Sequence, residues 1–460
     1  MELENKSNFA KGSIYKHILA LAVPMTIAQM VQVLYSIVDR IYIGHLPGAS
    51  SLALTGLGLT FPIITIVMAI TNLFGMGGAP LCSIARGQQD VERAEKVMGN
   101  TFKMLIISSF ILMFLAYIFL RPILFLFGAS EASYPYALEY MRIYLLGTPF
   151  IVIGSGMNGF INAQGFGNIG MITILAGAVV NIVLDPIFIF LFGLGISGAA
   201  IATVISQFVS VVWVMSFLLG KKTLLKINKE TMKIDGTILK EILGLGAASC
   251  LMTATNGVVQ VSCNTMLKDF GGDVYVGLMT VVNSVRDVAM LPIHGVTAAA
   301  QPVLGYNFGA KEYQRIKKGI IFVTFITTVY MIVSWVVILM FPAPLIKIFN
   351  SDPEMVAKGI SALHLYFFGF FMMAFQISGQ AVFVGLGQSK HAIFFTLFRK
   401  VIVVVPLTLI LPRLWNLGVD GVFIAEPVSN FLGGIACYTT MLFTMRKLLR
   451  DDEENPVENI

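Results

Sequence analysis

The chain has few charged residues for its length. Only 12% of its 460 residues are Asp, Glu, Lys or Arg, whereas 57% are hydrophobic and the mean hydropathy is +0.83. A typical soluble domain carries about 25% charged residues, so little polar surface is left here to keep a globule in water. This shortage excludes an ordinary soluble protein and predicts a polytopic membrane protein, whose surroundings include the lipid bilayer.

Cysteine is scarce as well, and the motifs of several enzyme classes are missing. The cysteines lie in apolar segments without CxxC spacing, which is typical of small buried side chains rather than of disulfides or zinc ligands: Cys82, Cys250, Cys263 and Cys437. The sequence has no HExxH, no GxSxG with a paired histidine, and no GxxxxGK[ST] phosphate loop. It therefore favours neither an enzyme nor an ATP-driven pump, and we expect no cofactor.

Long apolar runs recur from one end of the chain to the other. A membrane-spanning helix needs about 20 mostly apolar residues. Runs of this kind, separated by polar or Gly/Pro-rich breaks, predict about twelve spans with cores at 17–43, 52–80, 100–120, 136–160, 169–192, 197–219, 241–266, 276–303, 318–341, 358–384, 393–412 and 420–445. The predicted fold is therefore an all-α membrane protein.

The basic residues are distributed unevenly between the loops. With twelve spans both termini lie on one side, and the segments on that side carry most of the Lys and Arg, whereas the opposite loops offer Arg121, Lys268, Lys347 and Arg413. By the positive-inside rule, both termini are expected to face the cytoplasm. The polar N-terminus lacks a small-residue cleavage site, so the first span is expected to direct insertion. The net charge of +6 thus reflects orientation and does not indicate a nucleic-acid partner.

The two halves of the chain resemble each other at an offset of about 220 residues. GSIYKHILALAVP resembles GTILKEILGLGAA, GFGN resembles GLGQ, LDPIFIF resembles VVPLTLI, and GISGAAIAT resembles GVDGVFIAE. The duplication predicts two six-helix bundles related by a pseudo-twofold axis along the membrane normal, a plan that leaves a midplane cleft. We divide the chain into an N-terminal lobe (1–220), a basic cytoplasmic linker (221–240), a C-terminal lobe (241–447) and an acidic cytoplasmic tail (448–460), which we expect to be disordered.

Two aspartates interrupt the apolar spans of the first half. An ionisable side chain at mid-bilayer costs roughly 2.5–3.5 kcal/mol on insertion scales, so each one is a functional candidate. Asp185 follows Asn181 by one helical turn, so the carboxylate and the amide can converge on one ligand. The alternative is that Asp185 only holds the bundle together by an interhelical hydrogen bond.

Asp39 lies late in the first span. Gln32, Tyr35 and Asp39 recur at helical spacing, which places them on one face. The alternative is that Asp39 merely pairs with Arg40 near the membrane interface. With Thr203 of the sixth span, the two aspartates and Asn181 would supply hard oxygen ligands that suit a small hard cation.

Several segments, taken in order, resemble the MATE family, the multidrug and toxic-compound extrusion transporters. They are VDRIYIGHLPGASSLAL, GGAP…ARGQQD, QGFGN and LDPIFIF, and with the duplication they cover roughly residues 12 to 448. The resemblance implies a bacterial inner-membrane antiporter, monomeric, that exports drugs or other organic cations, often aromatic, in exchange for Na⁺ or H⁺. It also implies ion-coupling residues and a substrate path: Asp39, Asn181, Asp185 and Thr203 for the ion, and Gln32, Tyr35, Asp39, Asn158 and Asp185 for the substrate.

The same acidic residues suggest how ion and drug could be coupled. Two carboxylates in a poorly solvated site cannot both remain charged at low cost, so one of them is expected to take up a proton or to share a bound Na⁺. Either event would release a cationic drug held by the same charges. The hypothesis is that ion and drug compete for Asp39 and Asp185, and the sequence does not distinguish Na⁺ from H⁺.

The second half carries a different set of polar residues. Its first span reads CLMTATNGVVQVSCN and has no carboxylate, which argues against the C-lobe cation site of another MATE subgroup. We interpret Arg286 and Asp287 as a structural charge pair, and His294 and His364 as hydrogen-bonded packing residues. Glu426 either pairs with Arg399 or takes part in transport. The secondary candidates of this lobe are Asn256, Arg286, Asp287 and Glu426.

One other function in the same superfamily stays open. A flippase or exporter of a lipid-linked or metabolite cargo would need a cationic groove for pyrophosphate-linked molecules. The first lobe lacks an arginine cluster of that kind, so multidrug export is the favoured interpretation. A channel fits poorly with a duplicated chain that has no filter-like motif.

Overall fold

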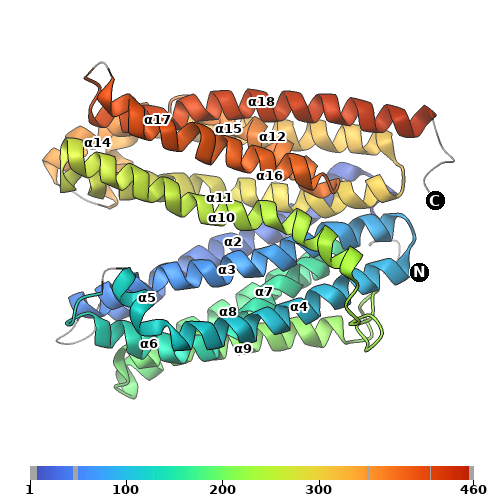
Figure 1. Cartoon of the computed structure of the whole chain (residues 1–460), viewed down its shortest axis with the longest axis horizontal. Helices are drawn as coiled ribbons and strands as arrows, with labels where there is room; N and C mark the ends of the chain where they lie inside the picture. Colours follow the sequence, from blue (N-terminus) through green and yellow to red (C-terminus); the bar gives the residue numbers. More distant parts are fainter. Residues whose placement is uncertain (1–7, 45–49, 128, 350–351, 415, 455–460) are drawn as a thin grey trace.

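The computed structural model describes residues 8–44, 50–127, 129–349, 352–414 and 416–454. In Figure 1 the long helices run side by side and separate into two bundles, one from each half of the chain. The first bundle contains α2 (Ile14–Gly44), α3 (Ser50–Gly87), α4 (Val91–Ile118), α5 (Leu120–Leu126), α6 (Tyr134–Leu146), α7 (Thr148–Ala163), α8 (Gly167–Pro186), η1 (Ile187–Leu191) and α9 (Gly195–Leu218).

The second bundle repeats this order. It contains α10 (Gly236–Gly271), α11 (Asp273–Gly309), α12 (Tyr313–Met340), α13 (Pro342–Lys347), α14 (Pro353–Tyr366), η2 (Phe370–Met372), α15 (Met373–Gly385), α16 (Ser389–Leu397), η3 (Phe398–Val404), α17 (Val405–Ile410), η4 (Leu411–Arg413) and α18 (Val419–Glu454). A fourth and a tenth span are each built from two helices, which bend by 55° between α6 and α7 and by 41° between α14 and α15.

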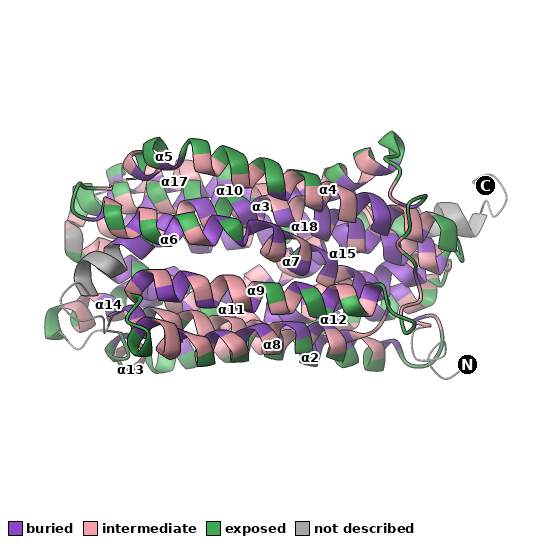
Figure 2. Ribbon diagram, turned by 90° about the horizontal axis from the view of Figure 1, so that it is seen from below, coloured by how far each residue is buried: buried purple, intermediate pink, exposed green. Residues whose placement is uncertain are grey.

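The helices have the length and the surface of a membrane protein. In the described part of the chain, nine helices are long and apolar enough to cross a bilayer, and the two bent pairs raise this number to eleven. The remaining predicted span falls within α18. Large apolar side chains such as Phe114, Ile118, Phe325 and Phe443 are exposed, and Figure 2 places exposed residues along the outer faces of the bundles. The prediction of an all-α membrane protein is thus confirmed.

The predicted boundaries were too short at several helix ends. The sequence places the second span at 52–80 and the third at 100–120, whereas α3 continues to Gly87 and α4 begins at Val91. These ends are polar, so hydropathy does not detect them although the backbone stays helical. The predicted disordered tail, 448–460, is helical over its first residues, because α18 continues through Glu454. Residues 455–460 lie outside the described part of the chain.

Each half contains a π-helical stretch next to the proline of its fifth span. In the first half η1 follows Pro186, and in the second half η3 precedes Pro406. Proline has no N–H for the usual bond to the carbonyl four residues back. The N–H of Val405 instead bonds to the carbonyl of Lys400, five residues back. Such π segments are rare and frequently lie at functional sites.

The two bundles are in close contact on the side of the molecule where the termini and the linker lie (Figure 1). Glycines make this approach possible. A Cβ atom at Gly246 of α10 would overlap the carbonyl oxygen of Leu73 in α3, and one at Gly309 of α11 would overlap the carbonyl oxygen of Ile84. Only glycine permits such backbone contact between the lobes.

Each bundle also forms hydrogen bonds to the segment that precedes the first helix of the other bundle. In the first, Asn100 donates to the carbonyls of Thr231 (3.3 Å) and Lys233 (3.0 Å) in the linker and accepts from the N–H of Asp235 (2.8 Å), directly before α10. In the second, the Arg315 guanidinium donates to the carbonyls of Phe9 and Gly12, at 2.7 and 2.6 Å, directly before α2. These crossed ties connect the lobes at the end that carries the linker.

Candidate functional site

The buried carboxylate of the first lobe lies where α2 packs against α8. Asp185 and Asn181 are both 0% exposed, and the Asn181 amide donates to Asp185 Oδ1 at 3.2 Å. Asp39, on α2, lies close enough to Asp185 for the two charges to interact. The structure therefore brings together the two aspartates and the asparagine that the sequence singled out.

The oxygens of this group are not fully used by hydrogen bonds. Among the described residues, neither Asn181 Oδ1 nor Asp185 Oδ2 accepts a hydrogen bond, although both atoms are buried. An unsatisfied buried acceptor costs free energy, and a cation or a proton would remove this cost. No group of three His, Cys, Asp or Glu occurs in the part of the chain that the structure describes, so a transition-metal centre is not indicated there.

Side chains from α6 and α9 complete the site. The Tyr140 hydroxyl on α6 lies beside Thr203 and Asp39. The Thr203 hydroxyl donates to the carbonyl of Ala199 at 2.9 Å, so its oxygen remains available as an acceptor. Tyr140 thus links Thr203 of α9 with Asp39 of α2, and Asp39 in turn interacts with Asp185 of α8. These side chains carry oxygen atoms, the ligands that hard cations prefer.

The predicted substrate residues fall at different distances from this location. Tyr35 interacts with both Asp39 and Asp185, so it belongs to the site. Gln32 lies one turn farther along α2 and is half-buried. Asn158 faces Gly170, where a Cβ would lie 3.1 Å from Asn158 Oδ1. Gly170 and Asn181 are separated by about 16 Å along α8, at about 1.5 Å per residue, so the structure does not bring Asn158 next to the aspartates.

A cavity lies between the two lobes. It has an empty volume of about 550 Å³ and is lined from the first lobe by Met25, Asn72 and Met76, among others, and from the second by Ala298 and Gln301. Residues of both lobes therefore line one cavity at the boundary where the lobes meet.

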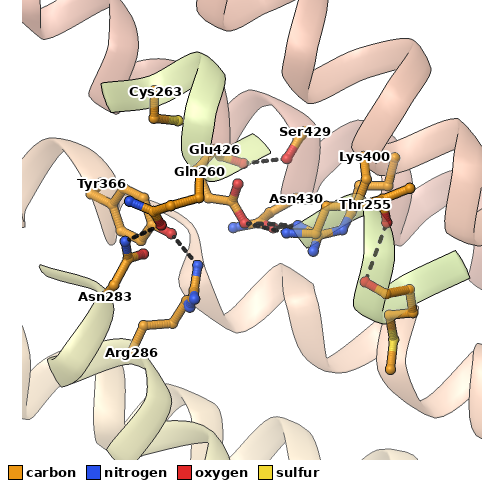
Figure 3. Close-up of polar contacts among 12 residues, drawn as sticks. Thr255, Gln260, Cys263, Asn283, Arg286, Tyr366, Lys400, Glu426, Ser429 and Asn430 are labelled. Carbon is orange, nitrogen blue, oxygen red and sulfur yellow. Dashed lines mark hydrogen bonds and ion pairs between the residues drawn. The ribbon is translucent and has the colours of Figure 1, made fainter. Parts of the chain in front are cut away.

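The second lobe contains a separate buried charge cluster (Figure 3). Glu426 of α18 accepts from the Arg399 guanidinium at 2.8 Å, and the Lys400 ammonium lies 4.0 Å from the same carboxylate oxygen. Arg399 also donates to Asn430 Oδ1 at 2.9 Å. Of the two alternatives for Glu426, the structure has the pairing with Arg399.

Arg286 lies at the opposite wall of the same cluster. Its guanidinium donates to the Tyr366 hydroxyl at 2.9 Å and pairs with Asp287 at 3.0 Å, as the sequence suggested. Asn256 lines the adjoining cavity, and His364 is hydrogen-bonded to the carbonyl of Leu339 at 3.1 Å. The Arg40 side chain, the alternative partner of Asp39, lies outside the described residues.

Sequence reasoning missed several site residues. Tyr140 and Tyr144 of α6 both border the acidic site, and Tyr144 faces Gln207 of α9. Gln207 follows Thr203 by one helical turn, so the helical spacing of polar residues in the sixth span was a usable signal. The tyrosines gave no such signal, because aromatic residues in an apolar span are usually packing residues.

Two helical bundles, a cavity between them and buried carboxylates inside one bundle define the architecture of a secondary transporter. The model of one transporter family, described as MatE, matches this chain twice, over residues 24–187 and 248–410. The chain belongs to the MatE family. The double match also confirms the duplication that the sequence predicted.

Curated relatives and solved structures agree with this assignment. The chain is similar to the multidrug export protein MepA of Staphylococcus haemolyticus, with 26% identity over 460 residues that cover 100% of both chains. It is also similar to a structure of MATE in the bent conformation, with a TM-score of 0.92, 25% identity, and coverage of 98% of this chain and 99% of the other. An outward-facing multidrug resistance MATE transporter of the MOP superfamily gives a TM-score of 0.89 and 26% identity, with coverage of 97% and 98%.

Proposed function

We propose that this protein is a secondary multidrug exporter that moves organic cations out of a bacterial cell in exchange for Na⁺ or H⁺. The observation that carries the proposal is the acidic site of the first lobe, where the charges of Asp39 and Asp185 interact and buried oxygens of Asp185 and Asn181 lack hydrogen bonds. The similarity to MepA supports multidrug cargo. The function needs no cofactor.

In this proposal the acidic site binds either the coupling ion or the cationic cargo. Two carboxylates that share a low-dielectric site attract a cation strongly. Binding of Na⁺ or H⁺ neutralises the charge that held the cargo, and the cargo is released. In this proposal Gln32 and Tyr35 belong to the substrate path, and the cargo enters through the cavity between the lobes.

We further infer that both termini and the linker lie in the cytoplasm of a monomeric protein in the inner membrane. The support is the excess of Lys and Arg in the segments on that side. Because the glycine contacts between the lobes lie on the same side, the conformation is closed toward the cytoplasm. The similarity to an outward-facing MATE structure agrees with this orientation.

A proteoliposome assay tests the proposal. Ethidium efflux is measured under an imposed Na⁺ gradient and, separately, under an imposed pH gradient. We expect at least one gradient to drive efflux by the wild type, and Asp185→Asn to reduce the gradient-driven rate about tenfold or more, because the amide cannot be neutralised by the ion.

The matched control is Asp420→Asn, which changes an exposed aspartate at the start of α18 and should keep the wild-type rate. Wild-type efflux by Asp185→Asn would contradict the assigned coupling site. A wild-type protein that responds to neither gradient would contradict ion-driven export itself.

A further inference from the structure

The charge cluster of the second lobe occupies the place that corresponds to the acidic site of the first lobe. The acidic site is built from the first, fourth, fifth and sixth spans of its half. The cluster is built from the same spans of the second half, with α11 added, and surrounds a cavity lined by Cys263, Tyr366, Lys400, Thr408 and Glu426, among others. In the sequence alignment Glu426 takes the position of Thr203, and Val405 that of Asp185. The two lobes therefore offer equivalent cavities with different charge.

The cluster holds more positive than negative charge. Arg399, Lys400 and Glu426 are 5%, 8% and 5% exposed. The Arg399 guanidinium forms a hydrogen-bonded ion pair with the Glu426 carboxylate. Arg286 forms an ion pair with Asp287, whose side chain is 69% exposed. Two further cations, Lys400 and Arg286, line the cavity with this single buried carboxylate between them.

Lys400 is the cation of this cluster that lacks a hydrogen-bonded counter-charge among the described residues. Its nearest acceptor is the Glu426 oxygen 4.0 Å away, which is beyond hydrogen-bond distance. Within the described residues its ammonium donates no hydrogen bond, although it carries three donors. A buried charge without a closely paired counter-charge is destabilising, and an anion in the cavity would supply the missing acceptor.

The cavity offers room and further polar groups for such an anion. Its empty volume is about 480 Å³, more than a bare ion requires, and the exposed side chain of Asn256 lies at its wall. Figure 3 shows Arg286, Tyr366 and Gln260 gathered on one side and Lys400 on the other. The Arg286 guanidinium donates to Asp287 through Nε and Nη2 and to the Tyr366 hydroxyl through Nη1. Toward the cavity it therefore offers its positive charge and its remaining N–H groups.

We propose that the C-lobe cavity is an anion site that binds the carboxylate group of a small organic molecule between Lys400 and Arg286. The site is the counterpart of the cation site in the first lobe, with its polarity reversed. The inference does not rest on the proposed export function, because occupancy of the cavity is measurable without transport. It implies that cargo molecules bearing a carboxylate have a binding place of their own in this protein.

Equilibrium binding of radiolabelled benzoate to the purified full-length protein in nanodiscs tests this site. Benzamide, a neutral molecule of the same shape, and chloride serve as unlabelled competitors. We expect unlabelled benzoate to displace the label, and benzamide and chloride at the same concentration to leave it bound. Lys400→Gln should weaken benzoate binding about ten- to hundredfold, the effect of losing a charge-assisted hydrogen bond.

Two further variants keep the result interpretable. Lys390→Gln removes an exposed lysine at the start of α16, the helix directly before η3, and should bind benzoate as the wild type does. Arg286→Gln reports on the other wall of the cavity and should weaken binding even if Lys400→Gln cannot be purified. Unchanged binding by both Lys400→Gln and Arg286→Gln overturns the proposal, and equal displacement by chloride overturns the assignment to an organic carboxylate.

Discussion

At the scale of single residues, the two lobes use buried charge in opposite ways. Among the described residues, the first lobe buries Asp185, whose Oδ2 accepts no hydrogen bond, and the second buries Lys400, whose nearest carboxylate oxygen is 4.0 Å away. Val405 takes the place of Asp185 in the second half, so the bundle packs without a carboxylate at that position. The charges are therefore better explained by ligands than by packing.

The role of Glu426 gives a prediction on stability. Its carboxylate is the buried counter-charge of Arg399 and Lys400. Removing one partner of a buried ion pair leaves an uncompensated charge and costs about 3–5 kcal/mol. We therefore expect Glu426→Gln to lower the thermal unfolding temperature of the purified protein strongly.

The control for Glu426→Gln is Glu354→Gln. Glu354 pairs with Lys358 at 2.6 Å, but its side chain is 65% exposed. Exposed pairs of this kind contribute about 0–1 kcal/mol, so this variant should unfold close to the wild-type temperature. Equal unfolding temperatures of the two variants would show that Glu426 does not stabilise the buried Arg399 and Lys400.

Residue patterns predicted part of the two sites and missed the rest for a physical reason. Asn181 and Asp185 were found because they lie one turn apart on one helix, where spacing alone fixes their contact. The joint burial of Arg399 and Lys400 could not be found this way, because neighbours in an α-helix point in different directions. In the π-helical η3, successive side chains point in other directions than in an α-helix. Which of these side chains are buried depends on how α18 packs against η3.

At the scale of elements, the segments before α2 and α10 are held by the opposite lobe. Arg315 of α12 binds the carbonyls of Phe9 and Gly12 and also Asn307 Oδ1, at 2.8 Å. Hydropathy predicted the spans on either side of these segments, since each span is apolar by itself. It carried no information on the ties, which join residues 306 and 131 positions apart in the chain.

Arg315→Lys tests this tie. Lysine keeps the charge but cannot present three donors in one plane, so it cannot satisfy all three acceptors. We expect a loss of about 2 kcal/mol in the free energy of unfolding, seen as a lower thermal unfolding temperature. The neighbouring exposed Lys318, changed to alanine, should shift stability by no more than about 0.5 kcal/mol; a similar effect of both changes would contradict the tie.

At the scale of the whole molecule, backbone atoms of the two lobes meet at glycines on the linker side, among them Gly246 and Gly309. A transporter that alternates its access must open this side, and contacts that depend on glycine can separate without breaking interlocked side chains. In the proposed function, the described conformation is one of the two that alternate during transport.

Gly246→Ala is expected to shift this equilibrium. Its new Cβ would overlap the carbonyl oxygen of Leu73, which is backbone and cannot move aside. The lobes should separate at the linker side, and double electron–electron resonance between spin labels at Glu92 and Lys311 should record longer distances than in the wild type.

Gly257→Ala is the matched control on the same helix. No atom lies within 4 Å of a Cβ at Gly257, so alanine there should leave the distance distribution unchanged and add about 0.5–1 kcal/mol of helix stability. An unchanged distribution for Gly246→Ala would show that the glycine contacts do not hold the lobes together.

The tie at Arg315 also sets an order of events during synthesis. The carbonyl of Phe9 can accept its hydrogen bond only after Arg315, 306 residues later in the chain, has been synthesised. At about 5–20 residues per second, the ribosome needs roughly 15–60 s to produce it. The first lobe must therefore insert and persist in the membrane with its entry segment unanchored, and the nascent chain completes its first half only after much of its second half has been made.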